Sequence, residues 1–133
     1  MTRRRTGQVP RPTDGELAIL RVLWKRGPCT VREVQEVLGA RRPTGYTTAL
    51  KLMQIMNEKG LLARDESRRT HVYRPTVSAE EVERGLVRDL LDRAFAGAAD
   101  RLVLRVLSAR KVSRDELARI REMLDEIEKK EGR

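Results

Sequence analysis

Apolar residues along this 133-residue chain recur every three to four positions in several segments, which is the spacing of amphipathic helices. Four of these segments begin with Ser/Thr-x-x-Glu, a capping box in which the hydroxyl and the carboxylate satisfy free backbone N–H groups at a helix start. The four boxes are Thr13–Glu16, Thr30–Glu33, Ser78–Glu81 and Ser113–Glu116. The pattern therefore predicts helix starts at four defined places.

The first three predicted helices follow one another closely. The first carries Leu17, Leu20 and Trp24 on one face and closes at Gly27 and Pro28. The second runs from Thr30 to Gly39 over a stripe of valines and one leucine. For the third we expect Thr44 as the N-cap, a run to Lys59 and a stop at Gly60. Its predicted core positions are Ala49, Leu52, Met53 and Met56, and Leu50 is expected to point outward.

A different pattern follows the third helix. Residues 61–66 and 71–75 are predicted as two short strands around a polar tip at 67–70. Three helices and a hairpin in this order are typical of a winged helix domain. The predicted fold class is mostly α with a small β-hairpin: a winged helix-turn-helix head, residues 13–77, and a C-terminal helical dimerisation tail, residues 78–133.

The tail has apolar faces but little room for a core of its own. In the last helix, apolar residues are spaced 3, 4 and 3, as in a coiled-coil seam, yet two heptads are too few for an independent coiled coil. The seam must close on helices of the same chain or of a second copy, and we favour a second copy. The predicted interface consists of Leu86, Leu90, Leu102, Leu117, Ile120, Leu124 and Ile127.

Charge divides the chain at about the same point. Residues 1–77 hold 16 Lys/Arg against 7 Asp/Glu, whereas residues 78–133 hold 13 of each, so the net charge of +9 lies entirely in the first part. Such a local excess attracts polyanions, which makes nucleic acid the leading partner and an acidic membrane surface the next. Residues 1–12 are predicted to be a flexible basic arm, either a solubilising tail or an additional DNA contact.

In helix-turn-helix proteins the second helix of the motif presents its N-terminal outward residues to the major groove. The predicted DNA-binding residues lie at that helix, at the turn before it, at the start of the preceding helix and at the hairpin tip. They are Thr30, Arg32, Arg41, Arg42, Thr44, Tyr46, Thr47, Thr48, Lys51, Gln54, Arg68 and Arg69. The alternative is that this is only the solvated face of an amphipathic helix.

Catalysis has little basis in this sequence. Cys29 is the only cysteine and His71 the only histidine, which excludes an intrachain disulfide and a Cys/His zinc cluster. No phosphate-binding glycine loop or His-Glu metal motif occurs. We expect no enzyme activity, no metal and no cofactor. Because no apolar run is long enough for a membrane span or signal peptide, a cytoplasmic location is expected and a membrane is not a partner.

Several of these segments together resemble the penicillinase repressor family. They are Thr13 to Trp24, Thr30 to Val34, Gly45 to Thr48, Lys59 to Leu62, Tyr73 to Pro75, Leu102 to Leu104 and Ser113 to Leu117. The resemblance covers residues 13–128. It implies a homodimeric transcriptional repressor that binds palindromic operator DNA through two winged helices, with its C-terminal helices interlocked.

The resemblance also implies a further partner, a sensor protease that triggers cleavage within the tail of resistance-controlling members. The family's cleaved Asn-Phe pair is matched by Arg105-Val106 here, and Ile55 replaces a common arginine of the recognition helix. A different class of function stays open: a winged-helix adaptor protein with nonspecific affinity for nucleic acid.

Overall fold

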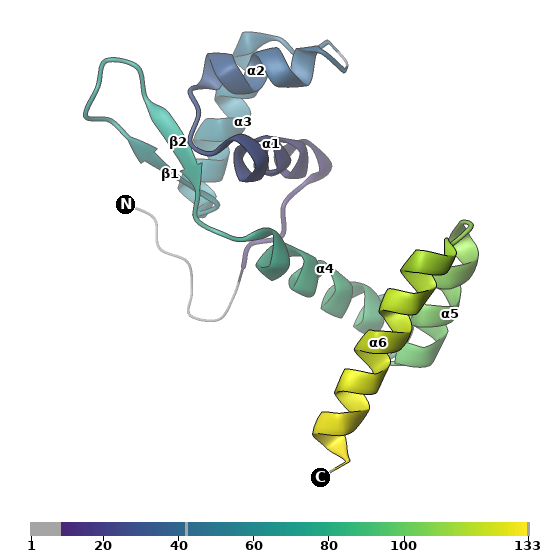
Figure 1. Cartoon of the computed structure of the whole chain (residues 1–133). Coiled ribbons are helices and arrows are strands. Elements are labelled where there is room, and N and C mark those ends of the chain that lie inside the picture. The colour runs from purple at the N-terminus through teal and green to yellow at the C-terminus, as the bar shows by residue number, and fades with distance from the viewer. Residues whose placement is uncertain (1–8, 42, 133) are drawn as a thin grey trace. The chain divides into compact units, whose positions relative to one another are not determined.

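The computed structural model describes residues 9–41 and 43–132. In this part the chain forms six helices and one two-stranded antiparallel sheet (Figure 1). The elements are α1 (Asp14–Arg26), α2 (Val31–Gly39), α3 (Tyr46–Lys59), β1 (Leu62–Asp65), β2 (Val72–Pro75), α4 (Ala79–Ala94), α5 (Ala99–Ala109) and α6 (Arg114–Glu131). The predicted mostly helical class with a small hairpin is confirmed.

Contacts divide the chain into two compact units, Met1–Asp89 and Leu90–Arg133, which we call the head unit and the tail unit. The division falls within α4, because Val82 is buried in the core of the head unit and Leu86 is half-buried against that core. The compact units meet after Asp89, whereas the predicted domain boundary lies between residues 77 and 78. Compact units need not coincide with domains, so the boundary stays a prediction.

Three capping boxes are complete. The Oγ1 atoms of Thr13 and Thr30 each accept a hydrogen bond from the backbone N–H three residues later, and the glutamate there accepts one from the threonine N–H. Ser78 and Glu81 make the same pair of bonds at the start of α4. Each box satisfies two N–H groups that a helix start leaves without intrahelical partners.

The prediction for the start of α3 was wrong. Gly45, not Thr44, is the N-cap of α3, and no side chain caps the helix. Thr44 contributes its backbone carbonyl instead, which accepts a hydrogen bond of 3.0 Å from the Gln35 side chain. This bond joins α2 to the segment that enters α3, so the turn is fixed from the preceding helix rather than by a cap.

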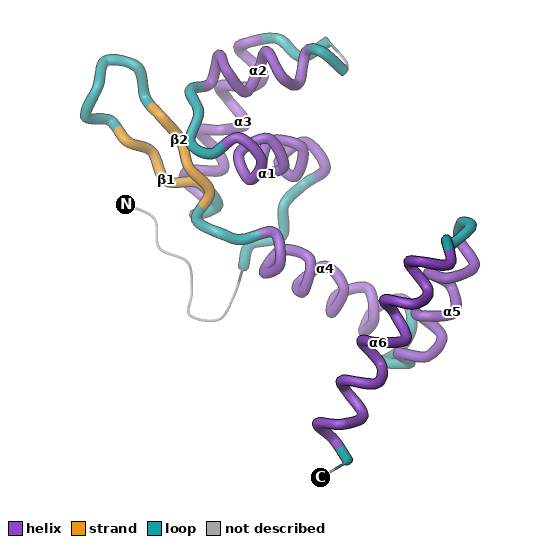
Figure 2. The backbone as a smooth tube through the Cα atoms, in the orientation of Figure 1, coloured by secondary structure: helices purple, strands orange, loops and turns teal. Residues whose placement is uncertain are grey.

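The strands β1 and β2 lie side by side in the hairpin (Figure 2). They pair in antiparallel register from Leu62↔Pro75 to Asp65↔Val72. Each strand is shorter than predicted, within the usual uncertainty of element ends. A third segment, which the sequence pattern did not predict, joins the strands: Cys29 exchanges two backbone hydrogen bonds of 3.0 and 2.8 Å with Tyr73. The hairpin is thereby attached to the connection between α1 and α2.

The core of the head unit lies between α1, α2, α3 and the hairpin. Its fully buried members are mainly aliphatic, and Tyr73 is the largest of them. Ala49, Met53 and Met56 are buried as predicted. Leu50, expected to point outward, is half-buried and packs against the core. Trp24 also packs there, and its indole N–H donates a 2.9 Å hydrogen bond to the Val77 carbonyl.

One charged side chain is buried in this core. Glu16 is only 2% exposed, and its Oε1 accepts hydrogen bonds from the Thr13 N–H at 2.9 Å and from Lys59 Nζ at 2.7 Å. Lys59 is the last residue of α3, and its side chain is 34% exposed. The pair therefore connects the first turn of α1 to the last turn of α3.

At the end of α3, Gly60 adopts the left-handed conformation, with φ 85° and ψ 11°, that favours glycine. Its N–H donates to the carbonyls of Met56 and Asn57, and the Thr76 hydroxyl donates to the Gly60 carbonyl. Gly60 is itself buried, so the stop predicted at this position is confirmed and also sets the direction in which β1 begins.

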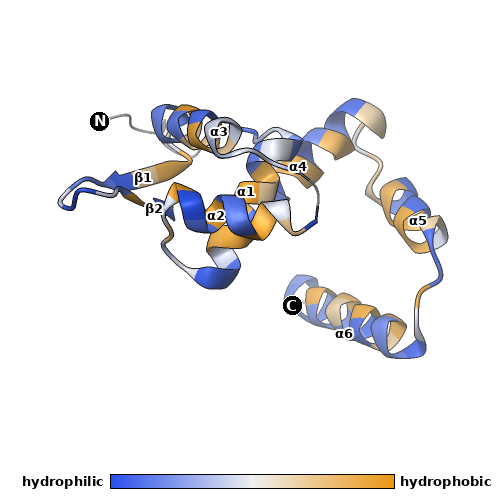
Figure 3. Ribbon diagram, turned by 90° about the horizontal axis from the view of Figure 1, so that it is seen from above, coloured by the Kyte–Doolittle hydropathy of each residue, from blue (hydrophilic) through white to orange (hydrophobic). Residues whose placement is uncertain are grey.

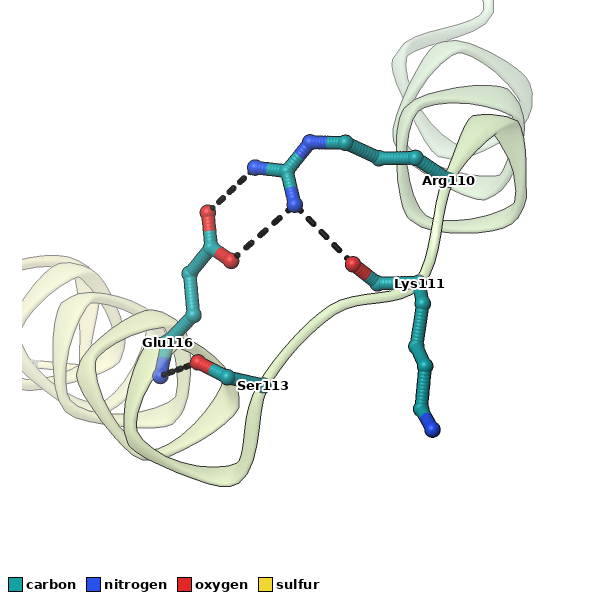
Figure 4. Close-up of polar contacts among 4 residues, drawn as sticks. All are labelled: Arg110, Lys111, Ser113 and Glu116. Atoms are coloured by element: carbon teal, nitrogen blue, oxygen red, sulfur yellow. Dashed lines mark hydrogen bonds and ion pairs between the residues drawn. The ribbon is translucent and has the colours of Figure 1, made fainter.

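The fourth capping box is only half formed. Ser113 Oγ accepts the Glu116 N–H at 3.1 Å, but the Glu116 carboxylate binds the Arg110 guanidinium in a two-bond contact with distances of 2.8 and 3.4 Å (Figure 4). Arg110 also donates to the Lys111 carbonyl at 3.0 Å. Because Arg110 at the end of α5 binds the carboxylate of Glu116 in α6, side chains stabilise the connection between the two helices.

The tail unit has no core comparable to that of the head unit. Neither α5 nor α6 contains a buried residue, and apolar positions lie among polar ones along both helices (Figure 3). The exposed large apolar side chains of this unit are Leu90, Val103, Leu104, Val106, Met123, Leu124 and Ile127. The tail unit thus exposes apolar surface that a soluble chain normally covers.

Candidate nucleic-acid interface

One face of α3 is polar and exposed along the first half of the helix. Thr47, Thr48 and Lys51 are exposed there, followed by Gln54, while Ala49 and Met53 on the opposite face are buried. Two hydroxyls, an ammonium group and an amide are the groups that suit base edges and phosphates. The predicted residues of this helix therefore share one accessible face.

Tyr46 begins α3 and is 43% exposed. The guanidinium carbon of Arg32, on the first turn of α2, lies 5.4 Å from the centre of the tyrosine ring. This is a cation–π distance, and an arginine held over a ring has fewer rotamers available than a free one. The contact joins the starts of α2 and α3 into one cationic and aromatic surface.

Thr30 already has a structural role at this surface. Its hydroxyl oxygen caps α2 by accepting the Glu33 N–H at 3.2 Å, and its own N–H donates to the Glu33 carboxylate at 2.8 Å. Hydrogen bonds to the Glu33 carboxylate lower its pKa, chiefly the bond from the backbone N–H of Thr30 and next one with the Thr30 side chain. Because the Thr30 N–H and hydroxyl oxygen both take part in the cap, a DNA contact by Thr30 would have to share these groups with Glu33.

The turn between α2 and α3 holds the next group of predicted residues. Arg41 is exposed, and Thr44 is half-buried with its carbonyl bonded to Gln35. Arg42 lies outside the described residues. Arg41 and Thr48 line the same surface cavity, so the turn brings at least one arginine next to the N-terminal half of α3.

The hairpin forms a second cationic cluster. It extends away from the three helices of the head unit in both views (Figures 1 and 3), and Arg68 and Arg69 are exposed in its connection. Asp65 fixes the start of that connection by accepting the Ser67 N–H at 2.9 Å, and bonds from Ser67 lower the pKa of Asp65. Two arginines at an exposed tip suit phosphate contacts.

Two residues of this surface were missing from the predicted set. Arg74 is exposed on β2, beside buried Tyr73, and the alternation of side chains along a strand is the signal that could have found it. Arg64 on β1 is half-buried and bonded to Glu66. A hydrogen bond with the Tyr73 side chain, and next the bond to Glu66, raises the pKa of Arg64. Arg64 thus supports the hairpin, while Arg74 adds to its exposed charge.

Within the described part of the chain, no group of three or more His, Cys, Asp or Glu side chains is arranged to hold a metal ion. Cys29 is buried, and this burial is the main cause that raises the pKa of its thiol. None of the described helices has the length and apolar character that a bilayer crossing requires.

The predicted interface residues of the tail vary in exposure. Leu124 and Ile127 are 56% and 58% exposed, and Leu90 is 47% exposed. Leu102, Leu117 and Ile120 are half-buried within the tail unit. Leu86 belongs to the head unit, where its half-burial against the core already gives it a packing role. Among the predicted interface residues, the two most exposed are therefore on α6.

Comparisons with known proteins agree with this geometry. The chain is 35% identical over 120 residues to the transcriptional regulator BlaI of Mycobacterium tuberculosis, covering 90% of this chain and 86% of that protein. It is 24% identical over 119 residues to the penicillinase repressor of Bacillus licheniformis, covering 90% and 93%. The solution structure of the DNA-binding domain of the repressor BlaI matches 56% of this chain and 90% of its own, with a TM-score of 0.50 and 24% identity.

The structural match confirms the winged helix fold predicted from the order of helices and hairpin. The family model described as penicillinase repressor matches residues 12–126, which includes both the head and the last helix. The two relatives of this chain are named as a transcriptional regulator and a repressor and not as enzymes, in agreement with the prediction that this chain has no enzyme activity. This chain belongs to the penicillinase repressor family.

Proposed function

We propose that this protein is a homodimeric transcriptional repressor that acts in the cytoplasm and binds palindromic operator DNA through its winged helix-turn-helix. In this proposal α3 enters the major groove, and Thr47, Thr48, Lys51 and Gln54 face the bases. Arg32, Arg41 and the hairpin tip contact phosphates on either side. Each protomer then reads one half-site.

The observation that carries the proposal is the shared polar face of α3. Its outward residues are exposed in the very helix that the winged helix fold presents to DNA, and cationic groups lie next to it at the start of α2 and in the turn. A merely solvated helix face would not need an arginine held over Tyr46 at its start. Membership of a repressor family supports the same conclusion.

The dimer is supported by the tail unit. Exposed apolar side chains on α5 and α6 are unfavourable in water, and a second copy of the same helices is the simplest surface that covers them. Residues 78–133, which include all three tail helices, carry 13 acidic and 13 basic residues, so two copies of this stretch would approach without net repulsion. Two heads joined in this way would match a two-fold symmetric operator.

A sensor protease is not included in the proposal. Arg105 and Val106, which stand where the family's cleaved pair would be, lie inside α5. A protease binds its substrate in an extended form, so this part of the helix would first have to unwind. The pair also differs chemically from the Asn-Phe pair expected at that position.

The test is binding of the full chain to a labelled duplex from its own upstream region, compared with a shuffled duplex, across a salt series. We expect a preference of about a thousandfold for the native duplex at physiological salt. Equal and steeply salt-dependent binding to both duplexes would refute operator recognition at that site and favour the adaptor function.

Two variants examine the recognition helix in the same assay. Thr48→Ala and Lys51→Ala should each weaken binding to the native duplex by roughly tenfold, the size of one lost polar contact. Arg84→Ala is the matched control, because Arg84 is exposed on α4 and paired with Glu80 within its own helix. Unchanged affinity in both recognition variants would remove α3 from the interface.

A further inference from the structure

The head unit contains a cavity that the proposed DNA contacts do not explain. It lies between α1, the C-terminal part of α2 and the segment that enters α3, and its volume is about 920 Å³. Pockets for small molecules typically measure about 300–1,000 Å³, so this cavity is large enough for one.

The floor of the cavity is apolar. Val22 on α1 is buried, and Val37, Leu38 and Leu52 are half-buried around it. At the start of α1 the cavity is lined by two residues with small side chains or none, Gly15 and Ala18, which leave room for an occupant. Apolar surface that stays in contact with water costs free energy, and an apolar occupant would remove that cost.

The rim of the cavity is cationic. Arg21, Lys25 and Arg26 line it from α1, and Arg41 lines it from the turn after α2; all four are exposed. Among the described residues that line the cavity, none is acidic. Four cations above an apolar floor are complementary to a molecule with an anionic head and an apolar body.

DNA alone does not account for this combination. A phosphate contact requires cations or N–H donors, but it gains nothing from a floor of valine and leucine side chains. Inorganic anions likewise have no part that could occupy the floor. The apolar floor and the cationic rim together therefore define the class of ligand more narrowly than either does alone.

The same cavity touches the proposed DNA-binding surface. Thr44, Gly45 and Thr48 form one of its walls, and Arg41 belongs both to the rim and to the predicted phosphate contacts. An occupant with its anionic group at Arg41 would compete with DNA phosphate for that arginine. It would also contact the first turn of α3.

We propose that this cavity binds a small amphipathic anion, of which a medium-chain carboxylate is the simplest example, and that its occupation weakens DNA binding. The aliphatic chain lies on the floor formed by Val22, Val37, Leu38 and Leu52. The carboxylate lies at the rim among Arg21, Lys25 and Arg41. The effect on DNA rests on the proposed repressor function, whereas the binding of the anion does not.

The first experiment is calorimetric titration of the full chain, without DNA, with decanoate below its micellar concentration. We expect one decanoate to bind per chain. Decanol, which lacks the charge, and propionate, which lacks the chain, should each bind at least about tenfold more weakly than decanoate. Inorganic phosphate that binds as tightly as decanoate would overturn the proposal, because the cavity would then be a phosphate site only.

Variants separate the cavity from other apolar surface, above all the exposed helices of the tail unit. Ala18→Leu fills the floor and should weaken decanoate binding about tenfold, while Ala79→Leu, the same change outside the cavity, should not. The pair Arg21→Gln with Lys25→Gln should weaken it severalfold, while Arg84→Gln with Arg88→Gln should not. Equal binding to wild type and Ala18→Leu would overturn the site.

The second experiment measures binding to the duplex from the upstream region with and without decanoate. We expect decanoate to release DNA from the wild-type chain and not from Ala18→Leu. Specific DNA binding that decanoate leaves unchanged would overturn the coupling. Absence of specific DNA binding would instead count against the proposed repressor function, and the titration without DNA would still decide whether the cavity binds the anion.

Discussion

The ion pair between the buried Glu16 carboxylate and the partly exposed Lys59 side chain leads to a prediction about stability. Replacing Lys59 by Met keeps the aliphatic stem but leaves the Glu16 carboxylate buried without its cation. At 2.7 Å and an effective dielectric constant of about 20, the attraction between the two charges is about 6 kcal/mol before desolvation is counted. Breaking a fully buried pair in this way typically costs about 3–5 kcal/mol.

The expected cost for Lys59→Met is about 2–3 kcal/mol, below that range, because a third of the lysine side chain is exposed and water can partly solvate the carboxylate. Glu16→Gln should cost only about 1 kcal/mol: it removes the buried charge itself, and the amide oxygen can still accept the Thr13 N–H. In the double variant the two costs should not add, because the pair is already broken in each single variant.

The assay is urea unfolding of the full chain followed by the fluorescence of Trp24, the only tryptophan, which packs on the core of the head unit. Protein concentration is held constant, since self-association would change the apparent stability. Free energies are compared by linear extrapolation. A larger cost for Glu16→Gln than for Lys59→Met would refute the reasoning, because it would show that the carboxylate is solvated or held mainly by its cap.

Three further predictions concern separate parts of the chain. Trp24→Phe removes the indole hydrogen bond to a backbone carbonyl and should lower the free energy of unfolding by about 1–2 kcal/mol in urea titrations followed by circular dichroism. Leu117→Asp with Leu124→Asp should convert a dimer to monomers in sedimentation; a variant that still sediments as a dimer would remove α6 from the interface. Bonds from Arg110 are the main cause that lowers the pKa of Glu116, so the stabilisation from this contact is present at neutral pH and lost as the pH falls through that lowered pKa. In NMR titration Arg110→Gln should raise the pKa of Glu116, and an unchanged value would show that the bonds seen in the structure do not hold in solution.

Much of the fold could be predicted because its signals are local. Three of the four capping boxes form both of their bonds, and the fourth still caps its helix through Ser113. Gly60 ends α3 as expected, since its backbone conformation is one that few other residues adopt readily. Such features depend on residues within four positions of one another, which a single sequence displays directly.

The features that could not be predicted depend on residues in different segments of the chain. The Glu116 carboxylate leaves its capping box because Arg110 stands across a turn, and nothing in Ser-x-x-Glu shows that competitor. The bridge between Cys29 and Tyr73 joins residues 44 positions apart through backbone bonds that any residue types could make. Patterns within one segment carry no information about such contacts.

The start of α3 shows how a local error affects the functional surface. Thr44 fits the preference for a hydroxyl at an N-cap, yet Gly45 takes that place, and the Thr44 carbonyl binds Gln35 of α2 instead. The predicted residues Tyr46 to Gln54 keep their exposed face, because helix periodicity does not depend on the cap. What changes is the support: the entry to the proposed recognition helix is held by α2, beside the cavity that Thr44 and Gly45 line. An occupant of that cavity would therefore act on the segment that positions α3, which is why the cavity and the DNA surface should be tested together.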